Sequence, residues 1–123
     1  MTVSSAEHVV MRALWARQPR TADEIVAEVA AGRDWTDATV RTLLNRLLKK
    51  GAIAAEKDGR RYLYRAVLDQ DDYLQEQSRT LLDRFFDGRL SSMILHFSER
   101  ERLSADEIAE LKRLIADLDD GQR

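Results

Sequence analysis

The feature that most constrains the fold is a change of hydrophobic period directly after Gly51. Before it, apolar residues recur every three or four positions, as on an amphipathic helix. After it they alternate with polar residues, as on a strand. The alternating stretch is centred on Asp58-Gly59, a dipeptide typical of type I′ hairpin turns. The sequence therefore predicts helices followed immediately by a β-hairpin.

The helix before Gly51 has two contrasting faces. Thr36 or Asp34 is the candidate N-cap, and Gly51 supplies a left-handed stop. One face is apolar and is made of Val40, Leu43, Leu44, Leu47 and Leu48. The other face is made of Thr39, Arg41, Thr42, Asn45, Arg46 and Lys49. No acid occurs between positions 38 and 55, so this polar face suits phosphates and base edges, although an ordinary solvated basic face is the alternative.

Two shorter helices are predicted to precede this one. Ser4 with Glu7 forms a capping box that begins a helix over about 5–16. Thr21 with Glu24 forms a second capping box, which begins a helix ending near Gly32. Only a few residues then join this second helix to the third, which is helix-turn-helix spacing.

The predicted hairpin has a definite register. Counting outward from Asp58-Gly59 gives four cross-strand pairs: Lys57 with Arg60, Glu56 with Arg61, Ala55 with Tyr62, and Ile53 with Tyr64. This register puts the two tyrosines, Ile53 and Ala55 on one face. A two-stranded ribbon is not stable alone, so that face is expected to pack on the helices. Three helices and a basic-tipped hairpin make a winged helix-turn-helix.

Residues 71–123 are predicted to form three further helices and no strand. The first runs from near Tyr73 to Gly88, a short one follows, and the last begins after a capping box of Ser104 and Glu107. About 50 residues are too few for an independent core, so we expect a second copy to complete it. The predicted dimerisation residues are Leu74, Leu81, Leu82, Phe85, Phe86, Ile94, Phe97, Ile108, Leu111, Leu114, Ile115 and Leu118.

The predicted fold class is therefore mainly α with a small β-hairpin wing. Residues 1–70 are expected to form a winged helix-turn-helix DNA-binding domain, and residues 71–123 a helical dimerisation domain. The net charge of −2 conceals an uneven distribution, since residues 33–65 hold nine Lys/Arg against four Asp/Glu. Residues 66–123 hold eight against fourteen. The basic middle is suited to a polyanion and the acidic end is not.

The predicted contacts to DNA come from three elements. The third helix would enter the major groove with Thr39, Arg41, Thr42, Asn45 and Arg46. Thr21, at the start of the second helix, would face a phosphate. Lys57, Arg60 and Arg61 on the wing would reach the flanking backbone. The alternative at each position is structural: Arg46 pairs with an acid, Asn45 is a spectator, and Arg60 is turn surface.

The sequence gives little support to catalysis. There is no cysteine, and His8 and His96 are the two histidines. Glu99 has helical spacing to His96, but two ligands do not make a metal site. No Gly-rich phosphate loop and no nucleophile elbow occur, so we expect no cofactor, no metal and no enzyme activity. No apolar run approaches 18 residues and no basic leader is present, which predicts a cytoplasmic protein without membrane insertion.

Taken in order, six segments resemble one known family: AEHVVMRALW, TADEIVAEV, DWTDATVRTLLNRLLKKG, EKDGRRYLYRA, FFDGRLSSMILHF and LSADEIAEL. Trp15, Trp35, the Thr39-Val40-Arg41-Thr42 run and the Phe86-Asp87-Gly88 joint are specific in combination. The chain is similar to the penicillinase-repressor (BlaI/MecI) family of bacterial transcription factors, with their copper-responsive CopY relatives.

The resemblance implies a homodimer whose C-terminal helices interlock and whose winged helices bind a dyad-symmetric operator, blocking transcription. The family's contacting residues fall on Thr39, Arg41, Thr42 and Arg46, whereas Ala38 stands where members often have Lys. Antibiotic-responsive members lose repression through a membrane metalloprotease sensor pathway that cuts between Asn and Phe. His96 and Phe97 occupy the equivalent positions, so the resemblance leaves this cleavage and the β-lactam response open. The copper branch uses C-terminal cysteines, and this chain has none.

A different class of function is also compatible with the sequence. The winged helix could bind a protein while the helical lobe dimerises, with only weak, non-specific binding to DNA. Competition by random duplex separates this alternative from sequence-specific repression.

Overall fold

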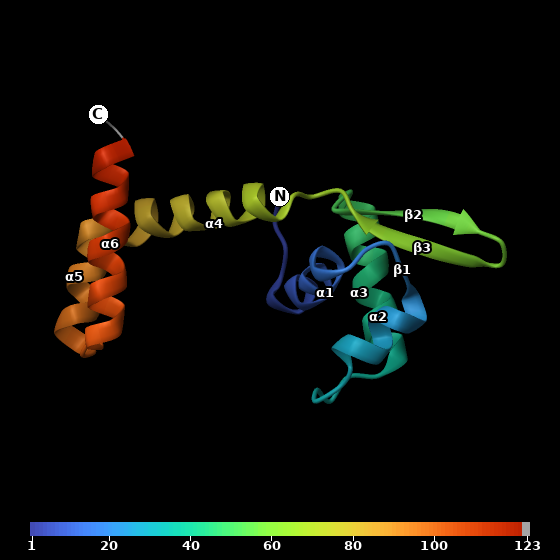
Figure 1. Ribbon diagram of the computed structural model, residues 1–123. Helices are drawn as coiled ribbons and strands as arrows, with labels where there is room; N and C mark the ends of the chain where they lie inside the picture. Colours follow the sequence, from blue (N-terminus) through green and yellow to red (C-terminus); the bar gives the residue numbers. More distant parts are fainter. Residues whose placement is uncertain (122–123) are drawn as a thin grey trace. The chain divides into compact units, whose positions relative to one another are not determined.

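The computed structural model describes residues 1–121. The chain forms two compact units, residues 1–74 and residues 75–123. The first unit contains α1 (Ser5–Ala16), β1 (Arg20–Thr21), α2 (Ala22–Val29), α3 (Asp37–Lys50), β2 (Ile53–Asp58) and β3 (Arg61–Ala66) (Figure 1). The second contains most of α4 (Gln70–Phe85), with α5 (Leu90–Arg100) and α6 (Ala105–Gly121).

The helices of the first unit begin where their capping residues predict. The Ser4 and Glu7 side chains each bond the other residue's backbone N–H, which completes the capping box of α1. Thr21 and Glu24 do the same for α2. Thr36 is the N-cap of α3, and its hydroxyl accepts the Thr39 N–H at 3.1 Å. The predicted starts of these three helices are therefore confirmed.

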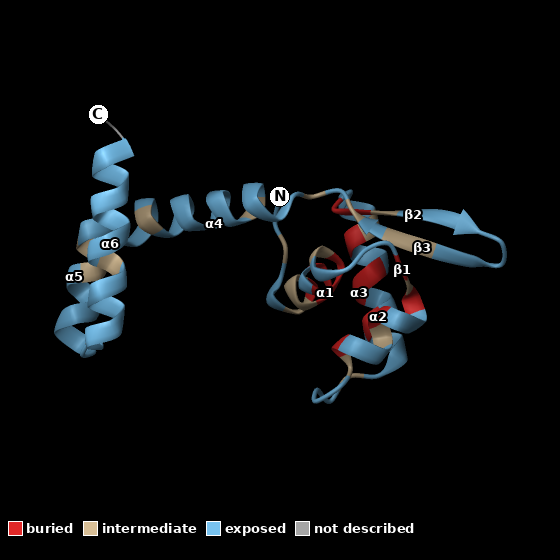
Figure 2. Ribbon diagram, in the orientation of Figure 1, coloured by how far each residue is buried: buried red, intermediate tan, exposed pale blue. Residues whose placement is uncertain are grey.

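The core of the first unit lies between these three helices and the start of β2 (Figure 2). The buried apolar residues are Val10, Met11, Ala13, Leu14, Ala22, Ile25, Val29, Val40, Leu43, Leu44, Leu47, Ala52 and Ile53. Because α3 contributes four of them on one side, its opposite side faces outward. The apolar face predicted for this helix is thus the one that packs.

The sheet has three antiparallel strands in the order β1-β3-β2. The hairpin of β2 and β3 was predicted, but β1 was not. Only two residues form β1, where Arg20 pairs with Tyr64 and Thr21 with Leu63. Such a short strand has no alternating pattern, so its position depends on the non-local partner.

The predicted hairpin register is wrong by two residues. In the structure Asp58 pairs with Arg61, Lys57 with Tyr62, Glu56 with Leu63, Ala55 with Tyr64 and Ile53 with Ala66. The turn is therefore Gly59-Arg60, not Asp58-Gly59. Gly59 has a φ of +65° and Arg60 a negative φ, which excludes the type I′ geometry. A shift by two keeps every side chain on its predicted face, because the strand period is two.

An ion pair with one buried partner, Glu7, connects the first and third helices. The Glu7 side chain is 3% exposed and accepts a hydrogen bond from Lys50 Nζ at 2.6 Å. Lys50 Nζ also donates to the Thr2 carbonyl. Burial raises the pKa of Glu7, but hydrogen bonds from Lys50 and Ser4 outweigh that effect and leave it below its ordinary value. The pair therefore ties the end of α3 to the start of α1.

The second unit has a different distribution of apolar side chains. No residue of α4, α5 or α6 is buried. The exposed large apolar residues of this unit are Leu81, Phe85, Leu90, Leu95, Phe97, Ile108, Leu114, Ile115 and Leu118. Asp87 and Gly88, with φ of +51° and +75°, come one residue after the end of α4 at Phe85. The Gly88 N–H then donates to the Leu82 carbonyl at 2.8 Å.

Candidate nucleic-acid interface

The outward face of α3 carries the predicted contact residues. Thr39, Arg41, Thr42, Asn45 and Arg46 are all exposed, on the side opposite the buried leucines. Arg46 has no ion-pair or hydrogen-bond partner among residues 1–121, which argues against the structural alternative for that residue. The side of the helix that carries these residues is thus directed to solvent and is available to a ligand.

The two threonines of this face are ordered by the helix itself. The Thr39 hydroxyl lies 3.0 Å from that of Thr36, and the Thr42 hydroxyl donates to the Ala38 carbonyl at 2.9 Å. The Thr42 hydroxyl proton is therefore used inside the helix, which leaves its oxygen and methyl group for contacts outside. Thr39, Thr42 and Arg46 also line a shallow hollow of about 300 Å³ along α3.

Arg41 is held by two carboxylates. Its Nε donates to Asp37 Oδ2 at 2.7 Å, one helical turn earlier, and its Nη2 donates to Asp23 Oδ1 of α2 at 2.5 Å. The hydrogen bond with Asp37, followed by the charges of both acids, raises the pKa of Arg41 above its ordinary value. Asp23 and Asp37 are not among the DNA-contact residues predicted from the sequence. The i, i+4 spacing of Asp37 and Arg41 is the signal that indicates one of these contacts.

The start of α2 is less open to phosphate than the sequence predicts. The half-buried Thr21 donates both its N–H and its hydroxyl to Glu24 Oε1, each at 3.0 Å. These bonds from the Thr21 backbone and hydroxyl lower the pKa of Glu24, so the carboxylate is ionised at neutral pH. With Asp23 beside it, the first turn of α2 presents two negative charges. The negative charges of Asp23 and Glu24 reduce the attraction of this helix end for an anion.

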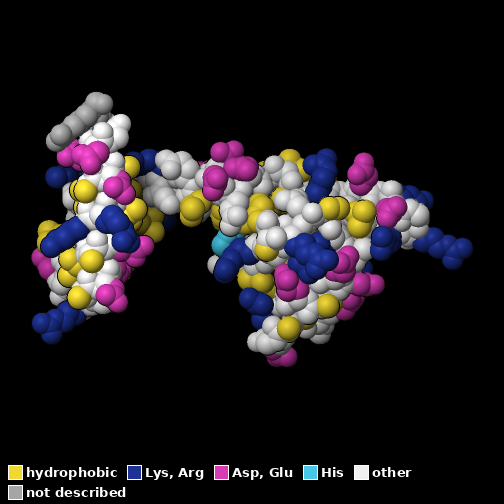
Figure 3. All heavy atoms as spheres, in the orientation of Figure 1, with side chains coloured by type: hydrophobic (Ala, Val, Ile, Leu, Met, Phe, Trp, Pro, Cys, Tyr) yellow, Lys and Arg dark blue, Asp and Glu magenta, His cyan; other side chains and the backbone are white. Residues whose placement is uncertain are grey.

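A second hollow brings residues of the wing next to α2 and α3. It measures about 250 Å³ and is lined by Thr21, Ala22, Asp23, Arg41, Arg60, Arg61, Tyr62 and Tyr64. Four of the predicted contact residues thus meet in one place, although they are far apart in sequence. Lys57 lies outside this hollow on β2, and Arg61 is paired with Asp58 at 3.2 Å. Lys and Arg side chains are visible at the wing tip (Figure 3).

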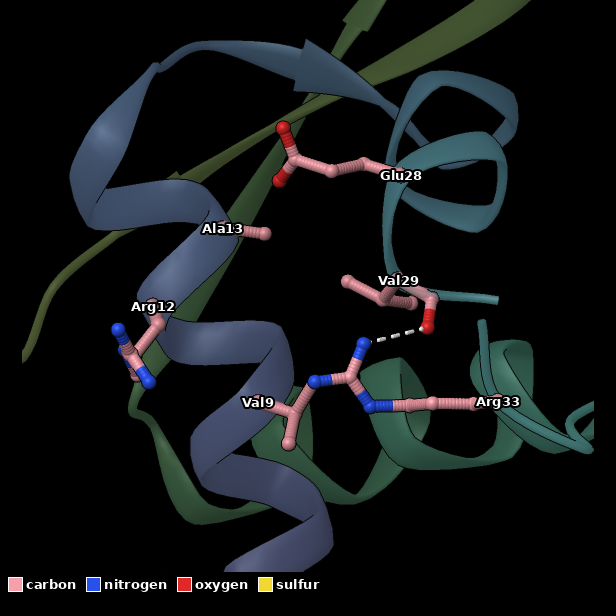
Figure 4. Close-up of a pocket in the computed structure, with 6 residues that line it drawn as sticks. All are labelled: Val9, Arg12, Ala13, Glu28, Val29 and Arg33. Carbon is pink, nitrogen blue, oxygen red and sulfur yellow. Dashed lines mark hydrogen bonds between the residues drawn. The ribbon is translucent and has the colours of Figure 1, made fainter. Parts of the chain in front are cut away.

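A third hollow, of about 270 Å³, lies between α1 and α2 and has mixed charge (Figure 4). Arg33 Nη1 donates to the Val29 carbonyl at 3.0 Å, and the Arg33 guanidinium lies over the Trp35 ring. Glu28 is paired at 3.0 Å with the buried Arg20, which belongs to β1. These bonds connect neighbouring elements of the first unit, so Arg33 and Glu28 of this hollow have structural partners.

The proteolytic position named from the resemblance lies inside a helix. His96 and Phe97 are both exposed and belong to α5. Their rings are 5.8 Å apart, and the Phe86 ring is 5.9 Å from His96. The bond between the two residues is therefore part of a regular helical backbone. Over residues 1–121, no helix is long and apolar enough to cross a membrane.

The fold and the exposed basic face define a winged-helix protein of the DNA-binding type. The model of the penicillinase repressor family matches residues 3–117. The chain is 37% identical over 113 residues to the penicillinase repressor of Bacillus licheniformis, covering 92% of this chain and 88% of that one. It is 36% identical to the methicillin resistance regulatory protein MecI of Mammaliicoccus sciuri, covering 92% of both chains.

A solved structure agrees with these sequence comparisons. Monomeric BlaI from Bacillus licheniformis, in complex with the blaP half-operator, aligns with a TM-score of 0.53 and 34% identity. The alignment covers 59% of this chain and 89% of that one. The chain belongs to the penicillinase repressor family. The resemblance and the fold class, mainly α with a small β wing, are confirmed, and the family is one of repressors, not of enzymes.

Proposed function

We propose that this protein is a transcriptional repressor that binds a dyad-symmetric DNA operator as a homodimer. The observation that carries the proposal is the outward face of α3 with Thr39, Thr42, Asn45 and Arg46. A helix of this kind reads base edges in the major groove, and Arg46 has the donors to bind guanine O6 and N7. The related BlaI in complex with a half-operator supports the same use of this fold.

The contacts of the wing and of α2 are assigned to the DNA backbone. Lys57, Arg60 and Arg61 carry the positive charge of the wing, and such contacts add affinity without reading sequence. Thr21 is assigned a weaker phosphate contact, because Glu24 already uses its hydroxyl and its N–H. Arg41, held by its two carboxylate partners, is assigned with the other outward residues of α3 to the major groove.

The exposed apolar residues of the second unit support the homodimer. Phe85 and Leu118 are each 64% exposed, and Ile115 is 60% exposed. Many large exposed apolar residues on helices that bury none are typical of an interface between subunits. A second copy packing on this face would bury it and place two winged helices on one operator.

The cellular context follows from repression. A protein that blocks transcription acts where the DNA is, which for a bacterial repressor is the cytoplasm. A membrane metalloprotease sensor pathway remains a candidate for relieving repression. Cleavage between His96 and Phe97 would require α5 to unwind locally, since proteases bind extended backbone.

The test is competition binding with the full chain. Labelled duplex enriched from a randomised library should stay bound in the presence of an equal concentration of random duplex. With six to ten phosphate contacts, affinity should also fall about 10³- to 10⁵-fold between 50 and 200 mM salt. Displacement by the equal random duplex would favour a protein-interaction module with weak, sequence-blind DNA binding. An affinity unaffected by salt would contradict operator binding through phosphate contacts.

A further inference from the structure

The network around Arg41 is an unusual feature of the proposed interface. Arg41 is an exposed arginine of α3, and its side chain is 46% exposed. Asp37 holds its Nε from within α3, and Asp23 holds its Nη2 from α2. Two of its five N–H groups are used in this way, and Nη1 has no partner among residues 1–121. The guanidinium is thus held by two carboxylates and keeps three N–H groups free.

The charges of this network are unfavourable for a simple phosphate contact. One guanidinium and two carboxylates have a net charge of −1, in a surface proposed to approach a polyanion. Electrostatic attraction to DNA is independent of sequence and grows with positive charge, so both acids lower it. A residue selected only to grip the backbone would be better without these neighbours. Their presence therefore needs another explanation within the proposed function.

Recognition of a base depends on direction as much as on charge. A flexible arginine loses conformational freedom when it binds, and a restrained one loses less. Three N–H groups of Arg41 remain, two on Nη1 and one on Nη2. One N–H from each of these two nitrogens can bind guanine, which offers two acceptors, O6 and N7, in the major groove. The two carboxylates restrain the arginine and use two of its five N–H groups.

We propose that Asp23 and Asp37 are positioning residues that aim Arg41 at a guanine in the operator. They raise discrimination between sequences and lower affinity for DNA of any sequence. The inference rests on the proposed function and adds to it the residues that set specificity at one base pair. Asp23 belongs to α2, so this specificity depends on the packing of both helices of the helix-turn-helix.

The experiment selects duplexes from a randomised library with the full chain and with four variants. Asp23→Ala and Asp37→Ala remove one restraint each, and Arg41→Lys keeps the charge but removes the planar fork. Asp34→Ala is the matched control, because Asp34 is an exposed acid before α3 that has no bond to Arg41. The readouts are the base preferences after selection and the affinities for the selected and the random duplex.

Asp23→Ala and Asp37→Ala should bind random duplex at least as tightly as the unmodified chain. They should lose preference at one guanine position per half-site, by up to about 5-fold each, because each exposed ion pair restrains Arg41 only weakly. Arg41→Lys should lose preference at that same position. Asp34→Ala should keep every preference. Thermal unfolding of each variant verifies that the fold is intact, which exposed positions favour.

Two results would overturn the inference, and they can be told apart. If both aspartate variants gain affinity equally for selected and random duplexes, with preferences unchanged, the acids only repel DNA and do not position Arg41. If the unmodified chain itself enriches no sequence, the proposed operator binding fails, and this inference fails with it.

Discussion

For Arg46, binding to DNA can be tested without changing the stability of the fold. Arg46 is exposed and forms no ion pair within residues 1–121, so its removal should leave the free energy of unfolding nearly unchanged. If it reads a base, Arg46→Ala should weaken binding to the selected operator by about 1 to 3 kcal/mol. Titration by fluorescence anisotropy measures this loss. Unchanged operator affinity would remove Arg46 from the set of contact residues.

The lowered pKa of Glu7 predicts that the free energy of unfolding depends on pH. Its pKa is lowered in the folded state, since hydrogen bonds from Lys50 and Ser4 outweigh its burial. The unfolded chain therefore binds a proton more readily, and the stabilisation is complete at neutral pH. It should be lost as the pH falls below about 4.5, through the folded-state pKa.

Comparison with Glu7→Gln isolates this contribution from the other carboxylates. The difference in unfolding free energy between the two proteins should be largest near neutral pH and should shrink towards about pH 3. Urea unfolding at several pH values measures it. A difference that stays constant across this range would mean that the charge of Glu7 does not stabilise the fold.

At the level of single elements, the end of α3 depends on one backbone conformation. Gly51 has a φ of +77°, and its N–H bonds the carbonyls of Leu47 and Leu48. A Cβ at this position would meet no atom within 4 Å, so a substitution is penalised by backbone conformation alone. Gly51→Ala should therefore lower the free energy of unfolding by about 1 to 2 kcal/mol. Gly51→Asn is the matched variant and should cost less, because Asn adopts left-handed conformations more easily. Equal losses would exclude conformation as the cause.

The elements that were predicted correctly are those that local sequence determines. Ser4, Thr21 and Thr36 cap helices through residues three positions away, so the signal lies within one helical turn. The register of the wing was wrong because Asp58-Gly59-Arg60 permits two placements of a tight turn. β1 was missed because two residues carry no period, and its pairing with β3 spans more than 40 residues of sequence.

In the proposed DNA-binding site too, local features could be predicted from the sequence and non-local contacts could not. The outward side of α3 follows from its 3.6-residue period, and the structure exposes the predicted residues there. The contact of Arg41 with Asp37 has helical spacing and is readable from sequence. Its contact with Asp23 is not, because α2 must first pack on α3. The convergence of Thr21, Arg60 and Arg61 on one hollow depends equally on the tertiary fold.

At the level of the whole molecule, the proposed function assigns separable roles to the two units. The first unit has its own core of buried residues, whereas the helices of the second bury none. If dimerisation occurs through the second unit, a substitution in that unit should lower affinity for a full operator of two half-sites. It should leave affinity for a single half-site unchanged. The effect of losing the dimer is then seen in avidity, because the second half-site is bound at high effective concentration.

Leu118→Asp tests this separation. Leu118 is 64% exposed on α6, and a carboxylate in an apolar interface would be buried without a partner. A cost of about 3 to 5 kcal/mol weakens dimerisation by roughly 10²- to 10³-fold or more. Sedimentation equilibrium should then show monomers where the unmodified chain forms dimers. Val67→Asp, at an apolar residue 54% exposed in the first unit, should leave the dimer intact.

The same two variants distinguish dimer loss from damage to the winged helix. Leu118→Asp should bind a single half-site as well as the unmodified chain does, and should lose affinity for the full operator. An unmodified chain that stays monomeric at micromolar concentration, or a Leu118→Asp variant that stays dimeric, would contradict an interface at this face. Because the half-site measurement reports only the first unit, failure of the dimer would leave the assignment of α3 to DNA unaffected.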